Sequence, residues 1–125
     1  SMKVDYVNSE KNVLISGYGE GWIKYGDHTL SSSFALSPQG LLIPDLPSIE
    51  NLKADDIIGL VDKETDIALL GTGAIQVFPD YALTLSLGKL GIALEVMDTG
   101  AACRSYNILA SEGRALLALL YMIQR

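Results

Sequence analysis

The first part of the chain alternates hydrophobic and polar positions. The stretch "NVLISGYGEGWIKYGDHTLSSSFALSP" (12–38) keeps this alternation over much of its length, which is typical of half-buried β-strands. Glycine-containing segments at 19–21 and 26–28 interrupt it and predict turns between antiparallel strands. A short apolar run at 41–43 predicts a buried strand, and prolines then fix an extended link. We therefore expect an antiparallel β-region here.

From residue 54 onward, helical and strand patterns alternate. Apolar positions from Ala54 to Val61 recur at helical spacing, and "DIALLG" (66–71) is a nearly continuous apolar run, typical of a parallel strand buried on both faces. The run "ALLALLYMI" (115–123) fits a strand or a helix by period alone, and its place after a glycine favours a strand. The other predicted elements are a helix between Pro79 and Gly91 with Leu83, Leu87 and Leu90 on its inner face, a strand at 92–97 and a helix at 101–111.

This order, strands first and then helices and strands in alternation, predicts an α/β domain. Its core sheet should be largely parallel, with an antiparallel β-extension at the amino-terminal end. The 125 residues suit one domain. Ser1, which precedes Met2, is interpreted as a remnant of cloning, so the predicted domain spans 2–125.

Composition and charge exclude several classes of protein. The formal net charge is −6 and the pI is about 4.5, and an acidic protein repels nucleic-acid phosphates. One cysteine cannot form an internal disulfide. The longest apolar run, 115–123, is about half of the ~20 residues that cross a bilayer, and no secretory leader or presequence is visible. We expect a cytoplasmic protein that neither binds nucleic acid nor inserts into membranes.

Two loops follow the carboxyl ends of predicted parallel strands, where ligands gather in α/β sheets. They are Gly71-Thr72-Gly73 and Asp98-Thr99-Gly100. The first, in "GTGA", is too short for a dinucleotide or P-loop fingerprint. It is either an anion-binding backbone turn or a tight exit from a strand.

The Asp-Thr-Gly tripeptide at 98–100 is also the way an aspartic protease presents its carboxylate. Such a protease pairs two carboxylates and is built of strands, whereas the segment after Gly100 has helical character. We therefore set the protease hypothesis aside. Asp98 is either the N-cap of the next helix or a functional carboxylate.

Cys103 and Arg104 fall in the predicted first turn of that helix. A helix N-terminus and a neighbouring arginine both favour a thiolate, but the sole histidine, His28, is far away in sequence. Cys103 is thus either a reactive thiol or a small buried hydrophobe. Arg104 is a candidate anion ligand or part of an ion network. We expect no metal and no cofactor.

Several segments together resemble one family. These are "LLGTG" (69–73), Pro79, "EVMDTGAACRSYNILASEGR" (95–114) and the upstream "SP" (37–38). They are similar to the Mth-nine-three-eight-like family, a domain of unknown function that includes the adipogenesis-associated domain-containing protein and a mitochondrial respiratory complex I assembly factor. The resemblance covers nearly the whole chain, in a bacterial form, and implies a single three-layer α/β domain with a central mixed sheet, flanking helices and the β-extension.

The resemblance also implies a site and a function. It places Gly71, Thr72 and Gly73 opposite Asp98, Thr99, Cys103 and Arg104 around one crevice. No acid, base and nucleophile set is visible, so we expect a non-enzymatic assembly or adaptor factor that acts through protein partners, such as components of respiratory complex I or of membrane-protein biogenesis. The alternatives are a protein or enzyme that binds a small molecule or anion between loops 71–73 and 98–104, and thiol chemistry at Cys103. A homodimer is a further possibility.

Overall fold

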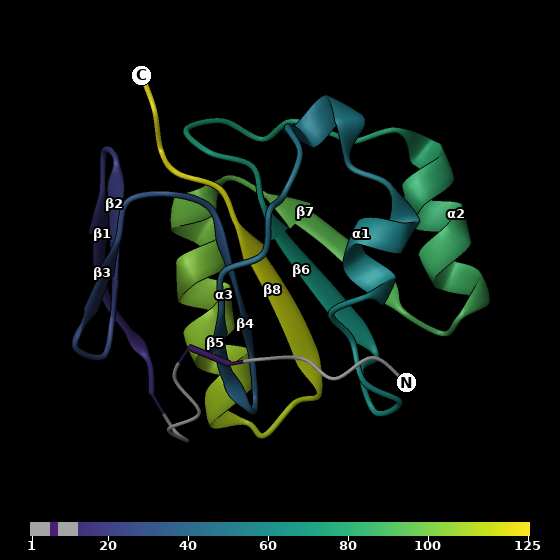
Figure 1. Cartoon of the computed structure of the whole chain (residues 1–125), viewed down its shortest axis with the longest axis horizontal. Coiled ribbons are helices and arrows are strands. Elements are labelled where there is room, and N and C mark those ends of the chain that lie inside the picture. Colours follow the sequence, from purple (N-terminus) through teal and green to yellow (C-terminus); the bar gives the residue numbers. More distant parts are fainter. Residues whose placement is uncertain (1–5, 8–12) are drawn as a thin grey trace.

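The computed structural model describes residues 6–7 and 13–125 and contains a five-stranded mixed sheet (Figure 1). β8 (Leu116–Leu120) lies between β4 (Phe34–Ser37) and β6 (Ile67–Gly71) and runs parallel to β6 and antiparallel to β4. β6 is also parallel to β7 (Ala93–Met97). The predicted mixed sheet is confirmed, and its parallel part consists of β8, β6 and β7. The strands, in spatial order, are β5 (Gly40–Leu42), β4 (Phe34–Ser37), β8 (Leu116–Leu120), β6 (Ile67–Gly71) and β7 (Ala93–Met97).

The central strands are buried at every position, which explains their continuous apolar sequence. All five residues of β6 and all five of β8 are buried, as strands covered on both faces require. The preference for a strand over a helix after Gly113 is thereby confirmed. The backbone of Gly113 has a φ of 73°, a left-handed conformation that suits glycine between the helix Thr99–Ser111 and β8.

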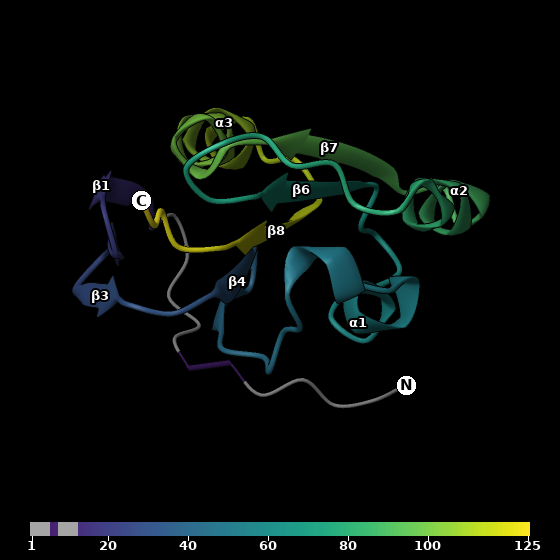
Figure 2. The same ribbon diagram turned by 90° about the horizontal axis from the view of Figure 1, so that it is seen from above.

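Helices cover both faces of the sheet, as a three-layer fold requires (Figure 2). α3 (Thr99–Ser111) lies on one face, and α1 (Ala54–Ile58) and α2 (Tyr81–Lys89) lie on the other. Alternate residues of the central strands supply the two cores. The first core contains Leu36, Leu69, Ala118, Ala102 and Tyr106, and the second contains Ala68, Leu70, Leu117, Ile57 and Leu87.

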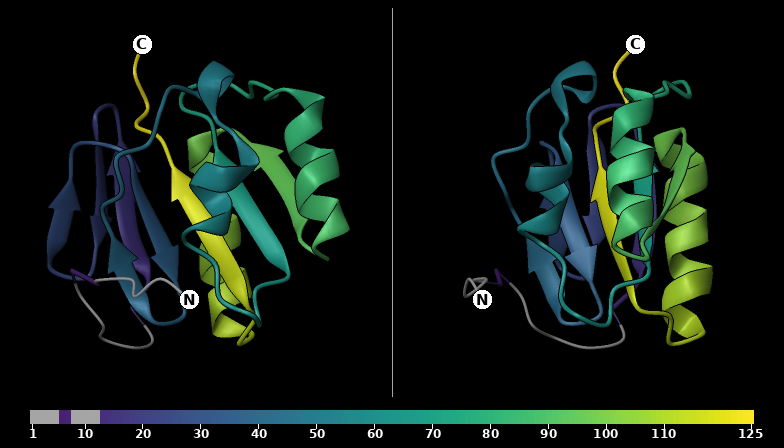
Figure 3. Two further views of the ribbon diagram at one scale, coloured as in Figure 1. Left: turned by 45° about the vertical axis from the view of Figure 1, so that its right-hand side comes forward. Right: turned by 90° about the vertical axis from the view of Figure 1, so that its right-hand side faces the viewer.

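A separate three-stranded antiparallel sheet forms the predicted β-extension beside α3 and β4 (Figure 3). Its strands are β1 (Ile15–Gly19), β2 (Trp22–Tyr25) and β3 (His28–Leu30). Both predicted turns are confirmed, since Gly21 and Gly26 have positive φ of 78° and 56° between these strands. The alternating stretch 12–38 is divided between two sheets. Its last strand, β4, is fully buried and pairs with β8 in the main sheet.

The bounds of the helices differ from the predictions for local reasons. α2 begins at Tyr81 because Asp80 is its N-cap and accepts from the N–H of Ala82 at 2.9 Å. Leu90, predicted on the inner face, is exposed because α2 has already ended at Lys89. α3 begins at Thr99, earlier than predicted. α1 ends at Ile58, and a short 3-10 helix, η1 (Ile49–Asn51), precedes it.

Over the described residues no helix combines the length and hydrophobicity needed to cross a membrane.

Asn107 on α3 holds the extension onto the main domain. Its Nδ2 donates to the carbonyl of Ile15 at 2.9 Å, and its Oδ1 accepts from the N–H of Ile15 at 2.9 Å. The amide thus replaces a strand partner at the beginning of β1. Because both bonds join residues far apart in sequence, they fix the position of the extension.

We expect Asn107→Ala to lower the free energy of unfolding by about 1–3 kcal/mol, since it leaves two partly buried backbone groups unpaired. Amide exchange in β1–β3 should rise more than exchange in β6 or β8. Urea unfolding and hydrogen exchange measure the two effects. Ser111→Ala, which removes an exposed hydrogen bond from the same helix, is the control and should change stability by less than about 0.5 kcal/mol. Unchanged exchange in β1–β3 would contradict the assigned role.

Candidate functional site

The two predicted loops meet at the carboxyl ends of the parallel strands, where Thr99 joins them. The Thr99 hydroxyl accepts from the N–H of Gly73 and donates to the carbonyl of Tyr121, both at 2.7 Å. The N–H of Thr99 donates to the carbonyl of Gly73 at 2.9 Å. Tyr121 directly follows β8, so the fully buried Thr99 side chain ties together the ends of β6, β7 and β8.

Thr72 organises the loop that follows β6. Its hydroxyl donates to the carbonyl of Ile75 at 2.6 Å and accepts from the N–H of Val77 at 3.0 Å. Its own N–H donates to the carbonyl of Met97 at 2.9 Å. The side chain of Thr72 is buried. Its hydrogen-bonding groups therefore hold the protein's own backbone.

Asp98 and Arg104 lie at the amino-terminal end of α3. The Asp98 carboxylate accepts from the N–H of Ala101 at 2.9 Å, which confirms the N-cap interpretation. Arg104 donates from Nη1 to the hydroxyl of Tyr18 on β1. A Cβ placed on Gly100 would be 3.1 Å from the Tyr18 ring and 3.5 Å from Arg104. A larger residue here would therefore push against the Tyr18 side chain, where the extension packs on α3.

Cys103 lies on the buried side of α3 and is 1% exposed. Burial raises the pKa of its thiol to about 12, against the lowering effect of Arg104, and Asp98 raises it further. The Arg104 charge does not offset the loss of hydration. Because α3 begins at Thr99, Cys103 and Arg104 lie in its second turn and not in the first turn as predicted. Over the neutral pH range Cys103 is therefore an uncharged thiol, which disfavours a nucleophilic role.

We expect native Cys103 to react with iodoacetamide at pH 8 about a thousandfold more slowly than in urea, because a pKa of about 12 rather than 9.0 lowers the thiolate fraction by that factor. The pKa of Cys103 is higher in the folded than in the unfolded protein. The contribution of the protonated thiol to the free energy of unfolding is therefore fully present below about pH 9 and is lost as the pH rises toward 12. Mass spectrometry of alkylated protein measures the rate, with Cys103→Ser as the blank. A native alkylation midpoint near 8.5 would revive the thiol hypothesis.

The seven predicted residues contribute little to two hollows in the described part of the chain. One hollow of about 500 Å³ is lined by Thr72 and Gly73 together with Ser31–Ser33, Glu50 and Tyr121. Asp98, Thr99, Cys103 and Arg104 line neither hollow. The serines come from the link between β3 and β4 and Glu50 comes from η1. Both are remote in sequence from the loops, and no local pattern connects them. Binding between loops 71–73 and 98–104 therefore stays a prediction.

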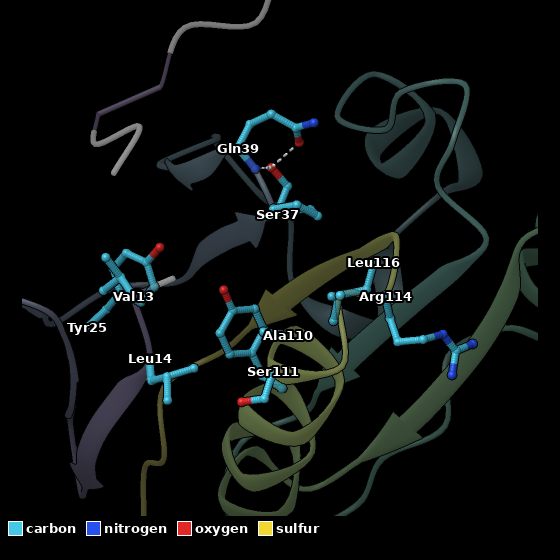
Figure 4. A pocket seen from close by; sticks show the side chains of 12 residues that line it. Val13, Leu14, Tyr25, Ser37, Gln39, Ala110, Ser111, Arg114 and Leu116 are labelled. Carbon is cyan, nitrogen blue, oxygen red and sulfur yellow. Dashed lines mark hydrogen bonds between the residues drawn. The ribbon is translucent and has the colours of Figure 1, made fainter. Parts of the chain in front are cut away.

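The other hollow, of about 550 Å³, lies where the extension meets the carboxyl-terminal end of α3 and the turn between β4 and β5 (Figure 4). Ser37 and Gln39 hydrogen-bond to each other at this turn. Tyr25 and Tyr106 supply the aromatic wall, and burial, with the Tyr25 hydroxyl beside it, raises the pKa of Tyr106. The Arg114 guanidinium points away from Tyr25 (Figure 4).

In the described part of the chain no group of three His, Cys, Asp or Glu side chains could hold a metal.

Comparison with known proteins assigns the fold to a family. Residues 15–121 match the family described as "Protein of unknown function (DUF498/DUF598)". The chain belongs to this family. Two relatives are similar to this chain over most of their length. An uncharacterized protein of Rhodobacter capsulatus is 33% identical over 108 residues, which cover 85% of this chain and 82% of the relative. NADH dehydrogenase (ubiquinone) 1 alpha subcomplex assembly factor 3 of Danio rerio is 26% identical over 122 residues, 96% of this chain and 70% of the relative.

Solved structures of similar fold agree with this assignment. A crystal structure from Bordetella parapertussis superposes with a TM-score of 0.81 at 28% identity. The match covers 92% of the present chain and 99% of the Bordetella parapertussis chain. A solution structure from Bordetella pertussis, described as a Mth938-like domain, has a TM-score of 0.77 at 23% identity. The match covers 98% of the present chain and 94% of the Bordetella pertussis chain. The resemblance to the Mth-nine-three-eight-like family is thereby confirmed.

Proposed function

We propose that this protein is a non-enzymatic assembly or adaptor factor that acts by binding protein partners. The observation that carries the proposal is that the polar groups at the strand ends are used internally. Thr72, Thr99 and Asp98 each bond the protein's own backbone. Among the described residues no buried side-chain nitrogen or oxygen lacks a hydrogen-bond partner. A site prepared for a substrate usually leaves such groups free or strains them.

The arrangement of titratable groups points the same way. Cys103 is the one cysteine of the chain, and burial keeps its thiol protonated. A cysteine nucleophile needs a base within hydrogen-bond reach, and the sole histidine, His28, lies on β3 in the extension. The Danio rerio relative is named an assembly factor for NADH dehydrogenase. For the present chain this supports a role in assembling a respiratory or other membrane complex.

A crosslinked pull-down of tagged protein from its own host tests this function, with Arg104→Ala as a parallel bait. The proposal predicts stable co-purification of subunits of a membrane complex or of its insertion machinery. If the wild-type protein is recovered alone under several mild crosslinking conditions, the proposed function is wrong. Size-exclusion chromatography with light scattering on the same material tests the predicted homodimer, and fractionation of the host tests the predicted cytoplasmic location.

A small-molecule role is the second candidate, favoured by the hollow beside Tyr25 and Tyr106. Its volume of about 550 Å³ falls in the range of ligand pockets. Native mass spectrometry of protein purified from the host would detect a retained metabolite. A ligand lost in Arg104→Ala would favour the crevice between loops 71–73 and 98–104. A ligand that the Arg104→Ala variant still binds would favour the hollow beside Tyr25.

A further inference from the structure

An exposed apolar ridge runs from the loop after β6 onto α2. Ile75 is 69% exposed, Phe78 is 73% exposed and Tyr81 is 68% exposed, which is unusual for side chains of this size. Val77 and Leu85 are also exposed. We call these five residues the loop–α2 ridge.

The ridge is separate from the core packing of α2. Tyr81 and Leu85 are four residues apart in α2, so they share one side of the helix, and Phe78 is exposed in the segment that leads into it. Leu83 and Leu87 lie on another side of the helix and are buried in the second core. The ridge therefore contributes nothing to the packing of α2 on the sheet. Clustered apolar surface of this kind marks an interaction site.

The loop that carries the ridge is held in place before any partner binds. Thr72 bonds the carbonyl of Ile75 and the N–H of Val77. Gln76 Nε2 donates to the carbonyl of Val96 on the outer strand β7 at 2.9 Å. Both anchors fix the backbone between the exposed side chains. Binding on a fixed surface avoids much of the entropy cost of ordering a loop.

The charges at the loop end of the ridge are negative. Ile75 also lines the hollow formed by Ser31–Ser33 and Glu50, and Glu50 is the only charged residue of that lining. Asp80, which is exposed, lies between Phe78 and Tyr81 in the chain. Burial, with Asp56 and Glu50 nearby, raises the pKa of Tyr121 in the same hollow to about 12. Lys89 lies one turn beyond Leu85, at the far end of α2.

We propose that the loop–α2 ridge and the hollow beside it dock a segment of a partner protein that carries apolar anchors together with lysine or arginine. This inference rests on the proposed function and names the surface and the partner chemistry. The apolar anchors would cover Phe78, Tyr81 and Leu85, and a cation would face Glu50 and Asp80. The acidic flank disfavours a second copy of this chain, which would bring like charges together, and it disfavours anionic lipid.

The test begins with a photo-crosslinking amino acid, benzoylphenylalanine, in place of Phe78 in tagged full-length protein. After irradiation in host extract, the crosslinked partner segment is sequenced and synthesised as a peptide. The same substitution at Ile108, an apolar residue of α3 that is 61% exposed, is the matched control. We expect the position 78 probe to give a segment with apolar residues and net positive charge, and the position 108 probe not to give it.

Binding of that peptide is then measured by titration calorimetry. Phe78→Asp should weaken it about 10- to 100-fold, as loss of an anchor does, and Tyr81→Ala should weaken it about 10-fold. Glu50→Gln should weaken it about 3- to 10-fold, and added salt should weaken the wild type more than Glu50→Gln. Ile108→Asp, which adds the same charge elsewhere, should change affinity less than about twofold. Unchanged thermal stability of the exposed-site variants excludes misfolding.

The outcomes separate this inference from the function on which it rests. A wild-type bait that captures no partner overturns both. A captured partner whose peptide binds Phe78→Asp as tightly as wild type overturns the docking site and leaves the assembly role standing. A crosslink to a second copy of the chain, a segment without lysine or arginine, or binding to phosphatidylserine vesicles that Phe78→Asp abolishes also overturns the docking proposal.

Discussion

Replacing Gly71 with valine is expected to lower the free energy of unfolding by about 3 kcal/mol. Gly71 ends β6 beneath α3. A Cβ there would lie 3.0 Å from the Cβ of Ala102, 3.0 Å from Leu120 Cδ2 and 3.1 Å from the Cα of Thr99. A flexible side chain can yield to such a contact, but the Thr99 backbone cannot move without separating α3 from the sheet. A branched side chain makes the overlap worse.

Urea denaturation of purified variants measures this effect, and the chain provides a matched control. Gly88 lies in α2, where an added Cβ would meet nothing within 4 Å. Gly88→Ala should therefore stabilise the protein by about 0.5–1 kcal/mol, because alanine is the better helix former. A Gly71→Val variant within about 1 kcal/mol of the wild type would show that α3 can move away from β6. In that case the close approach would not be a requirement of the fold.

The central strands could be predicted from sequence because burial on both faces leaves a direct trace. The apolar runs 66–71 and 115–123 correspond to β6 and β8, and turn glycines mark the strands of the extension. Membership of β4 in the main sheet could not be predicted. Its apolar positions continue the alternation of the extension, and only its pairing with β8 separates the two sheets.

The proposed docking surface was harder to predict, because apolar helix residues look alike in sequence. Leu83 and Leu87 are buried whereas Leu85 is half-exposed, and composition does not tell which of them is exposed. The spacing of Phe78, Tyr81 and Leu85 was the available signal. It falls across the helix start, where Asp80 interrupts the pattern.

The candidate residues at the strand ends were identified, but their bonding was not predictable. That loops 71–73 and 98–100 meet follows from parallel strands having their carboxyl ends at one edge. Whether a hydroxyl there faces a ligand or the chain depends on β8, whose end supplies the Tyr121 carbonyl that Thr99 bonds. The sequence places Tyr121 after the last strand, but it carries no information about this contact.

Thr99→Val is the second variant with a large expected effect. Valine has nearly the shape of threonine but can neither accept from the N–H of Gly73 nor donate to the carbonyl of Tyr121. Two backbone groups then lose their partner at a site where the side chain is fully buried. We expect the free energy of unfolding to fall by about 2–4 kcal/mol.

Thr99→Ser is the control, because it keeps the hydroxyl and removes one buried methyl group at a cost of about 1 kcal/mol. Urea unfolding gives the stabilities, and hydrogen exchange of residues 72–78 reports on the loop. If Thr99→Val and Thr99→Ser are equally stable, the methyl group rather than the hydroxyl holds the junction. Since the same loop carries Ile75, Val77 and Phe78, faster exchange there in Thr99→Val should accompany weaker binding of a partner to the loop–α2 ridge. The internal hydrogen bonds at the strand ends would then fix the docking surface in place.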